Sequence, residues 1–296
     1  MPYAKARDDC MLYYKDWGQG DPVVLLHGWP LTADTWDAAA MKLVEAGHRC
    51  IFPDRRGFGR SDQPWDGHDY DTYADDVAAV LEDADVQEKV SLVGFSMGGG
   101  EVARFLTRQG KDRVNQAVLA SSVVPLVVQR DDNPDGVPET KLQDMTQQMK
   151  TDRAAFMHGF FKTFFGVGMV SSPVSDQVLM NAWRQAMMAG LRPTLAAAKA
   201  FAYTDFRPDL KSFAGVPTLC IHGTADNTVP IDATGRVVAR QVPGAKLIEY
   251  EGSPHGLFET DKDRFCDDLV AFLGGDLGRI DAAAEQPTDR EEEKAY

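Results

Sequence analysis

Short apolar runs limit the fold of this chain more than any other feature of its sequence. A run in which nearly every position is apolar indicates a strand buried on both faces, and such strands are typical of parallel sheets covered by helices. Helical spacing at Thr72–Leu81 and Met97–Arg108 falls between the runs and predicts the covering helices. The four runs in the first 127 residues are Pro22–Leu26, Arg49–Pro53, Val90–Val93 and Ala117–Ala120.

The middle of the chain has a different character. From about residue 129 to 206 the β-branched runs stop, and seven of the eleven methionines lie in this stretch. Aromatic residues at helical spacing accompany them, namely Phe156, Phe160, Phe161, Phe164 and Phe165. We interpret this segment as a helical insert on the sheet.

Strand patterns return after the insert, at Pro217–Ile221 and Lys246–Tyr250, and a helical pattern follows at Leu257–Leu273. Alternating strands and helices on both sides of an insert predict one α/β domain with a cap rather than two independent domains. The expected fold is a mostly parallel central sheet flanked by helices, with a helical cap insert. Its expected boundaries are a core of residues 1–128 and 207–275, a cap of residues 129–206, and an acidic, disordered tail of residues 276–296.

Charge and composition exclude several classes of protein. The net charge is −14, and an acidic body repels a phosphate backbone, so we expect no binding to nucleic acid. The longest stretch without an acidic or basic residue, Val114–Gln129, is 16 positions long and holds several polar residues, which is too short for a membrane helix. The N-terminus shows no apolar region of a secretion signal, and the four cysteines are widely spread, so we expect reduced thiols in a cytoplasmic protein.

The sharpest local feature is the segment Gly94-Phe95-Ser96-Met97-Gly98, which has the pattern G-x-S-x-G between a predicted strand and a predicted helix. A tight turn at this place presents the Ser96 hydroxyl to a cleft, and the flanking glycines have no Cβ to obstruct the turn. The sequence therefore predicts a nucleophilic serine. The overlapping segment Gly98–Ala103 fits a loose dinucleotide-binding pattern, but the acidic residue expected about 20 positions later is missing.

A serine hydroxyl needs a general base and a carboxylate that orients the base. Of six histidines, only His222 and His255 follow the serine at strand ends, and His255 lies in a Gly- and Pro-rich loop after the last predicted strand. We expect His255 to be the base and His222 to cap a strand end. Asp226, in the loop after the preceding strand, is the expected orienting acid, with two further carboxylates as weaker candidates, Asp205 and Asp232.

Two backbone N–H groups are expected to bind the oxyanion that forms during attack by the serine. Met97 follows the nucleophile directly, and Trp29 lies in the turn after the first apolar strand, where Pro30 has no N–H to offer. We expect the loop Asp54–Asp62 to be a structural loop stabilised by charge. Some of the Met and Phe residues of the insert are expected to line an apolar pocket below the cap. No histidine shows the spacing of a metal ligand, so no metal site is expected.

With these elements in order, the chain resembles the α/β-hydrolase superfamily. It is most similar to the cofactor-free bacterial haloperoxidases, also called non-haem chloroperoxidases or perhydrolases, and to their arylesterase and γ-lactamase relatives. The resemblance covers residues 3 to 274. The stretches that carry it are His27–Leu31, Asp54–Asp62, Tyr70–Thr72, Val93–Glu101 and Ser253–Phe258.

The resemblance implies an enzyme without metal, haem or flavin, in which Ser96 forms an acyl intermediate with an ester or a small carboxylic acid. Water then releases the acid, whereas hydrogen peroxide releases a peracid that oxidises halide in solution. A γ-lactamase or another amide, C–C or ester hydrolase without significant perhydrolysis remains the alternative. Dehalogenase and epoxide hydrolase activities are disfavoured, because they need a carboxylate where Ser96 stands. The oligomeric state stays open, a homo-oligomer included.

Overall fold

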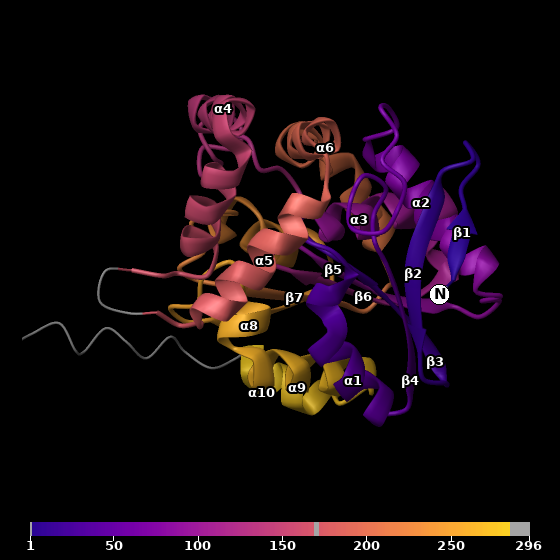
Figure 1. Cartoon of the computed structure of the whole chain (residues 1–296). Helices are drawn as coiled ribbons and strands as arrows, with labels where there is room; N and C mark the ends of the chain where they lie inside the picture. Colours follow the sequence, from indigo (N-terminus) through magenta and orange to yellow (C-terminus); the bar gives the residue numbers. More distant parts are fainter. Residues whose placement is uncertain (1, 169–171, 285–296) are drawn as a thin grey trace, which may run out of the picture.

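The computed structural model describes residues 2–168 and 172–284, and its centre is an eight-stranded sheet with the order β1-β2-β4-β3-β5-β6-β7-β8 (Figure 1). Strands β1 and β2 are antiparallel to their neighbours, and the other six run parallel. This confirms the predicted α/β class. The strands are β1 (Tyr3–Lys5), β2 (Met11–Trp17), β3 (Asp21–Leu26), β4 (His48–Pro53), β5 (Val90–Phe95), β6 (Val114–Ala120), β7 (Thr218–Gly223) and β8 (Lys246–Tyr250).

The six parallel strands include every apolar run of the sequence. Strand β5 is buried at all six positions, and so is β7, because each lies inside the sheet with helices on both faces. The hairpin β1–β2 at one edge was not predicted. Strand β1 is only three residues long, and β2 ends in Lys15, Asp16 and Trp17, which are not fully buried, so neither shows the long apolar run of a central strand.

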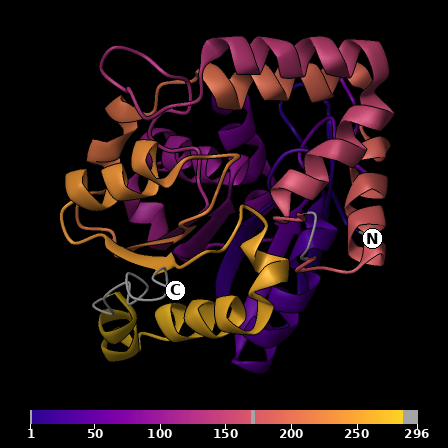
Figure 2. The same cartoon turned by 90° about the vertical axis from the view of Figure 1, so that its left-hand side faces the viewer.

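Helices cover both faces of the sheet (Figures 1 and 2). On one face α1 packs against α9, and on the other α2 packs against α3. The predicted helix Leu257–Leu273 is divided in two at Asp261. The helices of the core are α1 (Asp37–Glu45), α2 (Tyr70–Asp83), α3 (Met97–Gln109), α7 (Gly235–Gln241), α8 (Leu257–Thr260), α9 (Lys262–Leu273) and α10 (Leu277–Ala284).

Three helices from the insert between β6 and β7 form a separate layer, in which α4 (Glu139–Phe164) packs against α5 (Asp176–Met188) and α6 (Leu191–Tyr203). Figure 2 shows this layer along the top and one side of the molecule. Helix α4 is kinked at Asp152, whose backbone is not helical and whose carboxylate accepts a hydrogen bond from the N–H of Ala155. The kink lets α4 bend over the sheet edge below it.

The end of the described chain differs from the expected tail. Sequence analysis predicts disorder from residue 276, whereas the structure places α10 at Leu277–Ala284 and buries Ile280 completely. Helix α10 contacts α9 and β8, and the buried side chain of Ile280 and the ion pair between Lys246 and Asp281 hold it there. The rest of the predicted tail, residues 285–296, lies outside the described residues. Within residues 2–168 and 172–284, no helix is long and apolar enough to cross a membrane.

Candidate active site

Ser96 lies at the turn between β5 and α3. Its φ of 54° and ψ of −116° place a non-glycine residue in a strained part of backbone space. The neighbouring glycines make the turn possible: a Cβ on Gly94 would lie 2.4 Å from the carbonyl oxygen of Gly98, and one on Gly98 would lie 2.2 Å from that of Leu26. The turn therefore holds the Ser96 hydroxyl at the carboxyl edge of the sheet, as the G-x-S-x-G pattern predicts.

The structure brings the three predicted triad residues together from separate strand ends. The Ser96 Oγ lies 2.9 Å from His255 Nε2, and His255 Nδ1 lies 2.6 Å from Asp226 Oδ2. Since a carboxylate only accepts, His255 must carry its proton on Nδ1 in the neutral form, which leaves Nε2 free to accept the Ser96 proton. All three residues are buried.

Asp226 is held by four donors. Its Oδ1 accepts hydrogen bonds from the backbone N–H groups of Thr228 and Val229, at 2.9 and 2.8 Å. Its Oδ2 faces His255, and His222 Nε2 lies 3.3 Å away. Burial by itself would raise the pKa of the Asp226 carboxyl, but the two histidines outweigh it and hold that pKa well below its usual range. Asp226 is therefore a fixed negative charge at neutral pH.

Aromatic side chains surround the His255 ring. The ring centroids of Phe164 and Phe95 lie 4.8 and 5.1 Å from it, and the N–H of Gly256 donates to the carbonyl of Phe164 at 2.8 Å. A Cβ on Gly256 would lie 2.4 Å from the ring of Phe165. The carboxyl end of α4 thus packs directly on the loop that carries His255, so the insert helps to position the histidine.

The two predicted oxyanion donors lie beside the serine. Strand β3 pairs with β5 through Leu26 and Gly94, which brings the loop after β3 next to Ser96. Among the described residues, neither Trp29 nor Met97 uses its backbone N–H in a hydrogen bond outside the helices and strands. Met97 is the first residue of α3, where an N–H has no acceptor within the helix. Two free donors are thus available near the nucleophile.

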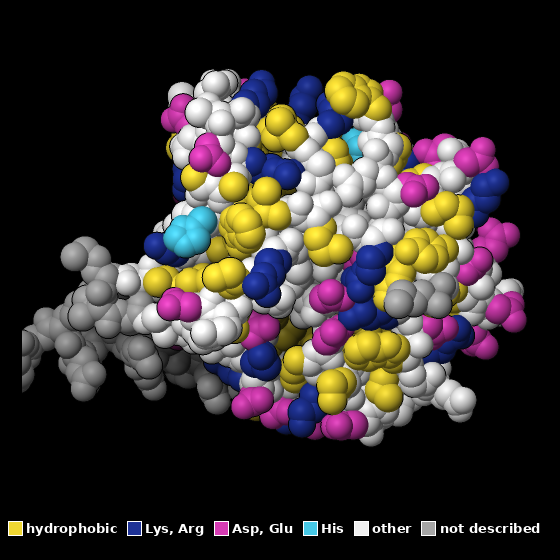
Figure 3. Space-filling view, viewed as in Figure 1, with side chains coloured by type: hydrophobic (Ala, Val, Ile, Leu, Met, Phe, Trp, Pro, Cys, Tyr) yellow, Lys and Arg dark blue, Asp and Glu magenta, His cyan; other side chains and the backbone are white. Residues whose placement is uncertain are grey.

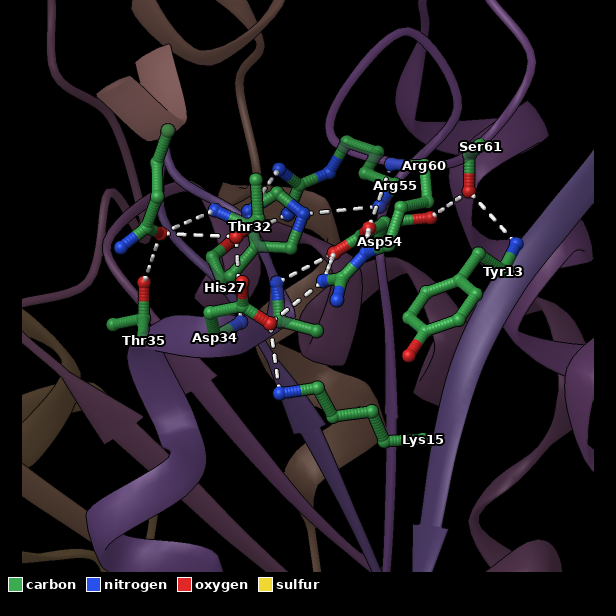
Figure 4. Close-up of polar contacts among 12 residues, drawn as sticks. Tyr13, Lys15, His27, Thr32, Asp34, Thr35, Asp54, Arg55, Arg60 and Ser61 are labelled. Carbon is green, nitrogen blue, oxygen red and sulfur yellow. Dashed lines mark hydrogen bonds and ion pairs between the residues drawn. The ribbon is translucent and has the colours of Figure 1, made fainter. Parts of the chain in front are cut away.

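The loop after β3 is fastened to both the core and the cap (Figure 4). On the core side, Asp54 Oδ1 accepts from the N–H of Ala33 at 2.7 Å, and Arg60 Nε donates to Asp54 Oδ2 at 2.6 Å. On the cap side, Gln185 Oε1 accepts from the N–H and the hydroxyl of Thr32, at 3.2 and 2.9 Å. These contacts fix the loop that carries Trp29, and the role of Asp54–Asp62 is structural, as expected.

A buried ion pair lies beneath the same loop. Arg55 and Glu101 are joined by two hydrogen bonds, with the Arg55 Nε at 2.9 Å from Glu101 Oε1, and their side chains are 2% and 4% exposed. Arg55 also donates to the carbonyl of His27 at 2.6 Å. Burial raises the pKa of the Glu101 carboxyl, although the guanidinium opposes this rise, and burial lowers that of His27 well below its usual value. The segment Gly98–Ala103 is therefore a buried helix turn holding this pair.

A cavity of about 570 Å³ opens onto Ser96 and His255. Its wall is mainly apolar, and the insert supplies most of it. The segment from α4 to α6 holds seven Lys and Arg against four Asp and Glu, in a chain whose net charge is −14, and Figure 3 shows basic side chains over α4 and α6. Because its wall is mainly apolar and its volume is about 570 Å³, the cavity can take a large apolar substrate. Apolar lining residues include Trp29, Val127, Leu142, Phe160, Phe201 and Val229.

The weaker candidates of the sequence lie elsewhere. Asp205 pairs with Arg207, and Asp232 pairs with Arg236, both in partly exposed positions. All four cysteines are buried free thiols, as predicted. In the described part of the chain, no group of three or more His, Cys, Asp or Glu side chains is arranged to hold a metal ion.

Sequence reasoning did not find the second contact of Asp226 with His222, the tie between Gln185 and Thr32, or the pair of Arg55 and Glu101. The first left a local signal, because His222 precedes Asp226 by four residues. The other two join residues 153 and 46 positions apart, and no sequence pattern marks them.

Comparisons with known proteins agree with this geometry. A family model described as "alpha/beta hydrolase fold" matches residues 21–262. A non-heme chloroperoxidase of Kitasatospora aureofaciens is 44% identical over 92% of this chain and 99% of its own, and a bifunctional esterase/perhydrolase of Acinetobacter calcoaceticus is also 44% identical, with the same coverage. The crystal structure of a bromoperoxidase from Bacillus anthracis superposes with a TM-score of 0.88 at 41% identity, covering 92% of this chain and 99% of that one.

Proposed function

Because the chain belongs to the alpha/beta hydrolase family, we propose that it is a serine hydrolase of carboxylic esters that also forms peracids from small carboxylic acids and hydrogen peroxide. The observation that carries this proposal is the chain of hydrogen bonds from Ser96 through His255 to Asp226, at the base of a cavity with two free N–H donors beside it. The names of the similar chloroperoxidase and esterase/perhydrolase support both halves of the activity.

In the first half of the reaction, the Ser96 oxygen attacks the ester carbonyl while His255 Nε2 takes the hydroxyl proton. The negative charge that develops on the carbonyl oxygen is stabilised by the N–H groups of Trp29 and Met97. The resulting imidazolium faces the Asp226 carboxylate, which holds its Nδ1 proton in place. His255 then gives its proton to the departing alcohol oxygen of an ester, or to the departing hydroxyl of a carboxylic acid, which leaves as water, and the acyl group remains on Ser96.

In the second half, His255 takes a proton from water or from hydrogen peroxide, and the oxygen so activated attacks the acyl carbon. Water releases the carboxylic acid, and peroxide releases the peracid; in both cases His255 returns a proton to the Ser96 oxygen. The peracid then transfers one oxygen atom to bromide or chloride in solution, giving hypohalous acid and the carboxylate. Halide oxidation in this scheme needs no halide site on the protein.

The size of the cavity bears on the substrate. A volume of about 570 Å³ falls within the usual range for pockets that bind small-molecule ligands, so esters larger than acetates, aryl esters included, are expected among the substrates. We place the activity in the cytoplasm, since four unpaired cysteines favour a reducing compartment.

One experiment separates the proposed function from a plain hydrolase. The purified protein is assayed with p-nitrophenyl acetate, with a cyclic lactam, and with acetate plus hydrogen peroxide and bromide, each with and without a chelator. Turnover of the ester and bromination that survive the chelator, and that are both lost in Ser96→Ala, are expected. Bromination that persists in Ser96→Ala contradicts the acyl mechanism, and ester or lactam hydrolysis without bromination favours the plain hydrolase.

A further inference from the structure

His222 is a second histidine on the carboxylate of Asp226. It comes at the end of β7, four residues before Asp226, and it is completely buried. Its Nε2 lies 3.0 Å from the carbonyl oxygen of Val229 and 3.3 Å from Asp226 Oδ2. Both neighbours can only accept, so His222 Nε2 must carry a proton and share it between them.

The other side of the His222 ring supports the same assignment. The Nδ1 atom is buried and has no hydrogen-bond partner among the described residues. A protonated Nδ1 would leave a charged N–H without an acceptor in the interior, which costs far more than an unpaired lone pair. The neutral form with the proton on Nε2 is therefore the form that fits the site.

Helix α7 fixes the ring in this position. It begins at Gly235, where a Cβ would lie 2.9 Å from His222 Nδ1 and 3.4 Å from its Cβ and Cγ atoms. A side chain at residue 235 would therefore displace the imidazole from its present position. The close approach of the helix backbone thus confines the His222 ring on its Nδ1 side.

We infer that His222 is a positioning residue for Asp226, and that its shared N–H holds both the carboxylate and the loop from Asp226 to Val229 in the reactive geometry. This inference rests on the proposed function. Asp226 Oδ1 is already taken by two backbone N–H groups, so Oδ2 is the atom that faces His255, and His222 donates to the same atom. Three residues of the held loop, Asn227, Thr228 and Val229, also line the cavity.

The arrangement has a consequence for the proton on His255. Within residues 2–168 and 172–284, the titratable groups paired with Asp226 are His222, at the end of β7, and His255, in the loop after β8. Gly235 of α7 approaches the His222 ring from its other side. The His222 N–H draws part of the carboxylate's negative charge toward itself. Without that donor, more of the carboxylate's negative charge would face the His255 ring.

The test compares His222→Phe, which keeps a planar ring but removes the donor, with His222→Gln, which restores an N–H. His222→Phe is expected to lower kcat for p-nitrophenyl acetate about ten-fold with little change in KM, the low end for a hydrogen bond to a charged acceptor. The acidic limb of its kcat/KM profile is expected to move to higher pH. His222→Gln should regain much of kcat and bring the limb back.

A matched control is available in His48→Phe. His48 is also a buried histidine with an unpartnered Nδ1, but it lies at the amino end of β4, away from Ser96. It should lose stability without moving the pH profile. A wild-type profile in His222→Phe, or an equal displacement in His48→Phe, overturns the inference.

Two further variants keep the outcome interpretable. If His222→Phe does not fold, Gly235→Ala displaces the ring while leaving His222 in place, and it should change kcat and the acidic limb but not KM; an unchanged profile overturns the inference. Ser96→Ala serves as the reference for the proposed function: if it keeps full activity, the proposed function fails, whatever His222 does.

Discussion

Replacing Asp226 by Asn changes one atom in the triad, and the structure determines which one. Asp226 Oδ1 accepts hydrogen bonds from the backbone N–H groups of Thr228 and Val229. An asparagine can satisfy those two donors only with its carbonyl oxygen. Its NH₂ group must therefore take the place of Oδ2, 2.6 Å from His255 Nδ1.

An NH₂ group at that place donates, so His255 Nδ1 must accept and its proton must move to Nε2. The Nε2 atom then points its own proton at the Ser96 Oγ, 2.9 Å away, and can no longer take the serine proton. We expect kcat to fall about 10⁴-fold, as for other triads given the wrong imidazole tautomer, which corresponds to roughly 5.5 kcal/mol in the barrier. Because the substitution conserves volume, the melting temperature should change much less than the rate.

The assay is kcat for p-nitrophenyl acetate at pH 7 to 8, with circular dichroism to show that the variant is folded. Asp232→Asn is the matched control, since that carboxylate pairs with Arg236 at the surface and should leave kcat unchanged. A folded Asp226→Asn enzyme within ten-fold of wild type would refute the reasoning, and a large loss in Asp232→Asn would move the orienting role to Asp232.

Three other substitutions test further parts of the structure. Ser96→Ala should lower esterase activity by roughly 10⁴–10⁶-fold while the fold survives, and a residual rate above a tenth of wild type would remove Ser96 from the mechanism. Glu101→Gln leaves the buried Arg55 charge without its partner and should lower the free energy of unfolding in urea by about 3–5 kcal/mol; a loss below 1 kcal/mol would contradict the pairing. The hydrogen bond from Arg56 lowers the pKa of Asp8, so the stabilisation from Asp8 is present at neutral pH and disappears as the pH falls through that lowered value. Asp8→Asn should therefore unfold more easily than wild type at pH 7, with a difference that shrinks below about pH 4.

Local sequence patterns are sufficient to predict the central strands and the turn that carries Ser96. The predicted runs Val90–Val93 and Pro217–Ile221 mark strands β5 and β7, which are buried at every position. The G-x-S-x-G segment predicted the place of Ser96, because only glycine tolerates the close backbone contacts of that turn. The chain order of Ser96, Asp226 and His255 followed from the strand ends that precede them.

Sequence patterns are less informative for elements at the margin of the fold, where only part of the residues is buried. Strand β1 has three residues, and the second half of β2 holds Lys15 and Asp16 in partly exposed positions, so the hairpin lacks the sequence signal of a buried strand. Helix α10 falls in the predicted tail, because it has one buried residue, Ile280, and its ion pair between Lys246 and Asp281 leaves no pattern in the sequence. Strand β2 enters the sheet by pairing with β4, and α10 packs on β8 as well as on the neighbouring helix α9.

Tertiary structure alone decided the polar partners that hold the site. Arg55 pairs with Glu101 and Thr32 bonds to Gln185, although each of these side chains has many possible partners in the sequence. The hydrophobic pattern specifies only which face of each helix or strand is buried. The choice of partner is made when packing buries a charged or polar group and leaves it only the acceptors within hydrogen-bond distance, because an unpaired group in the interior is too costly to keep.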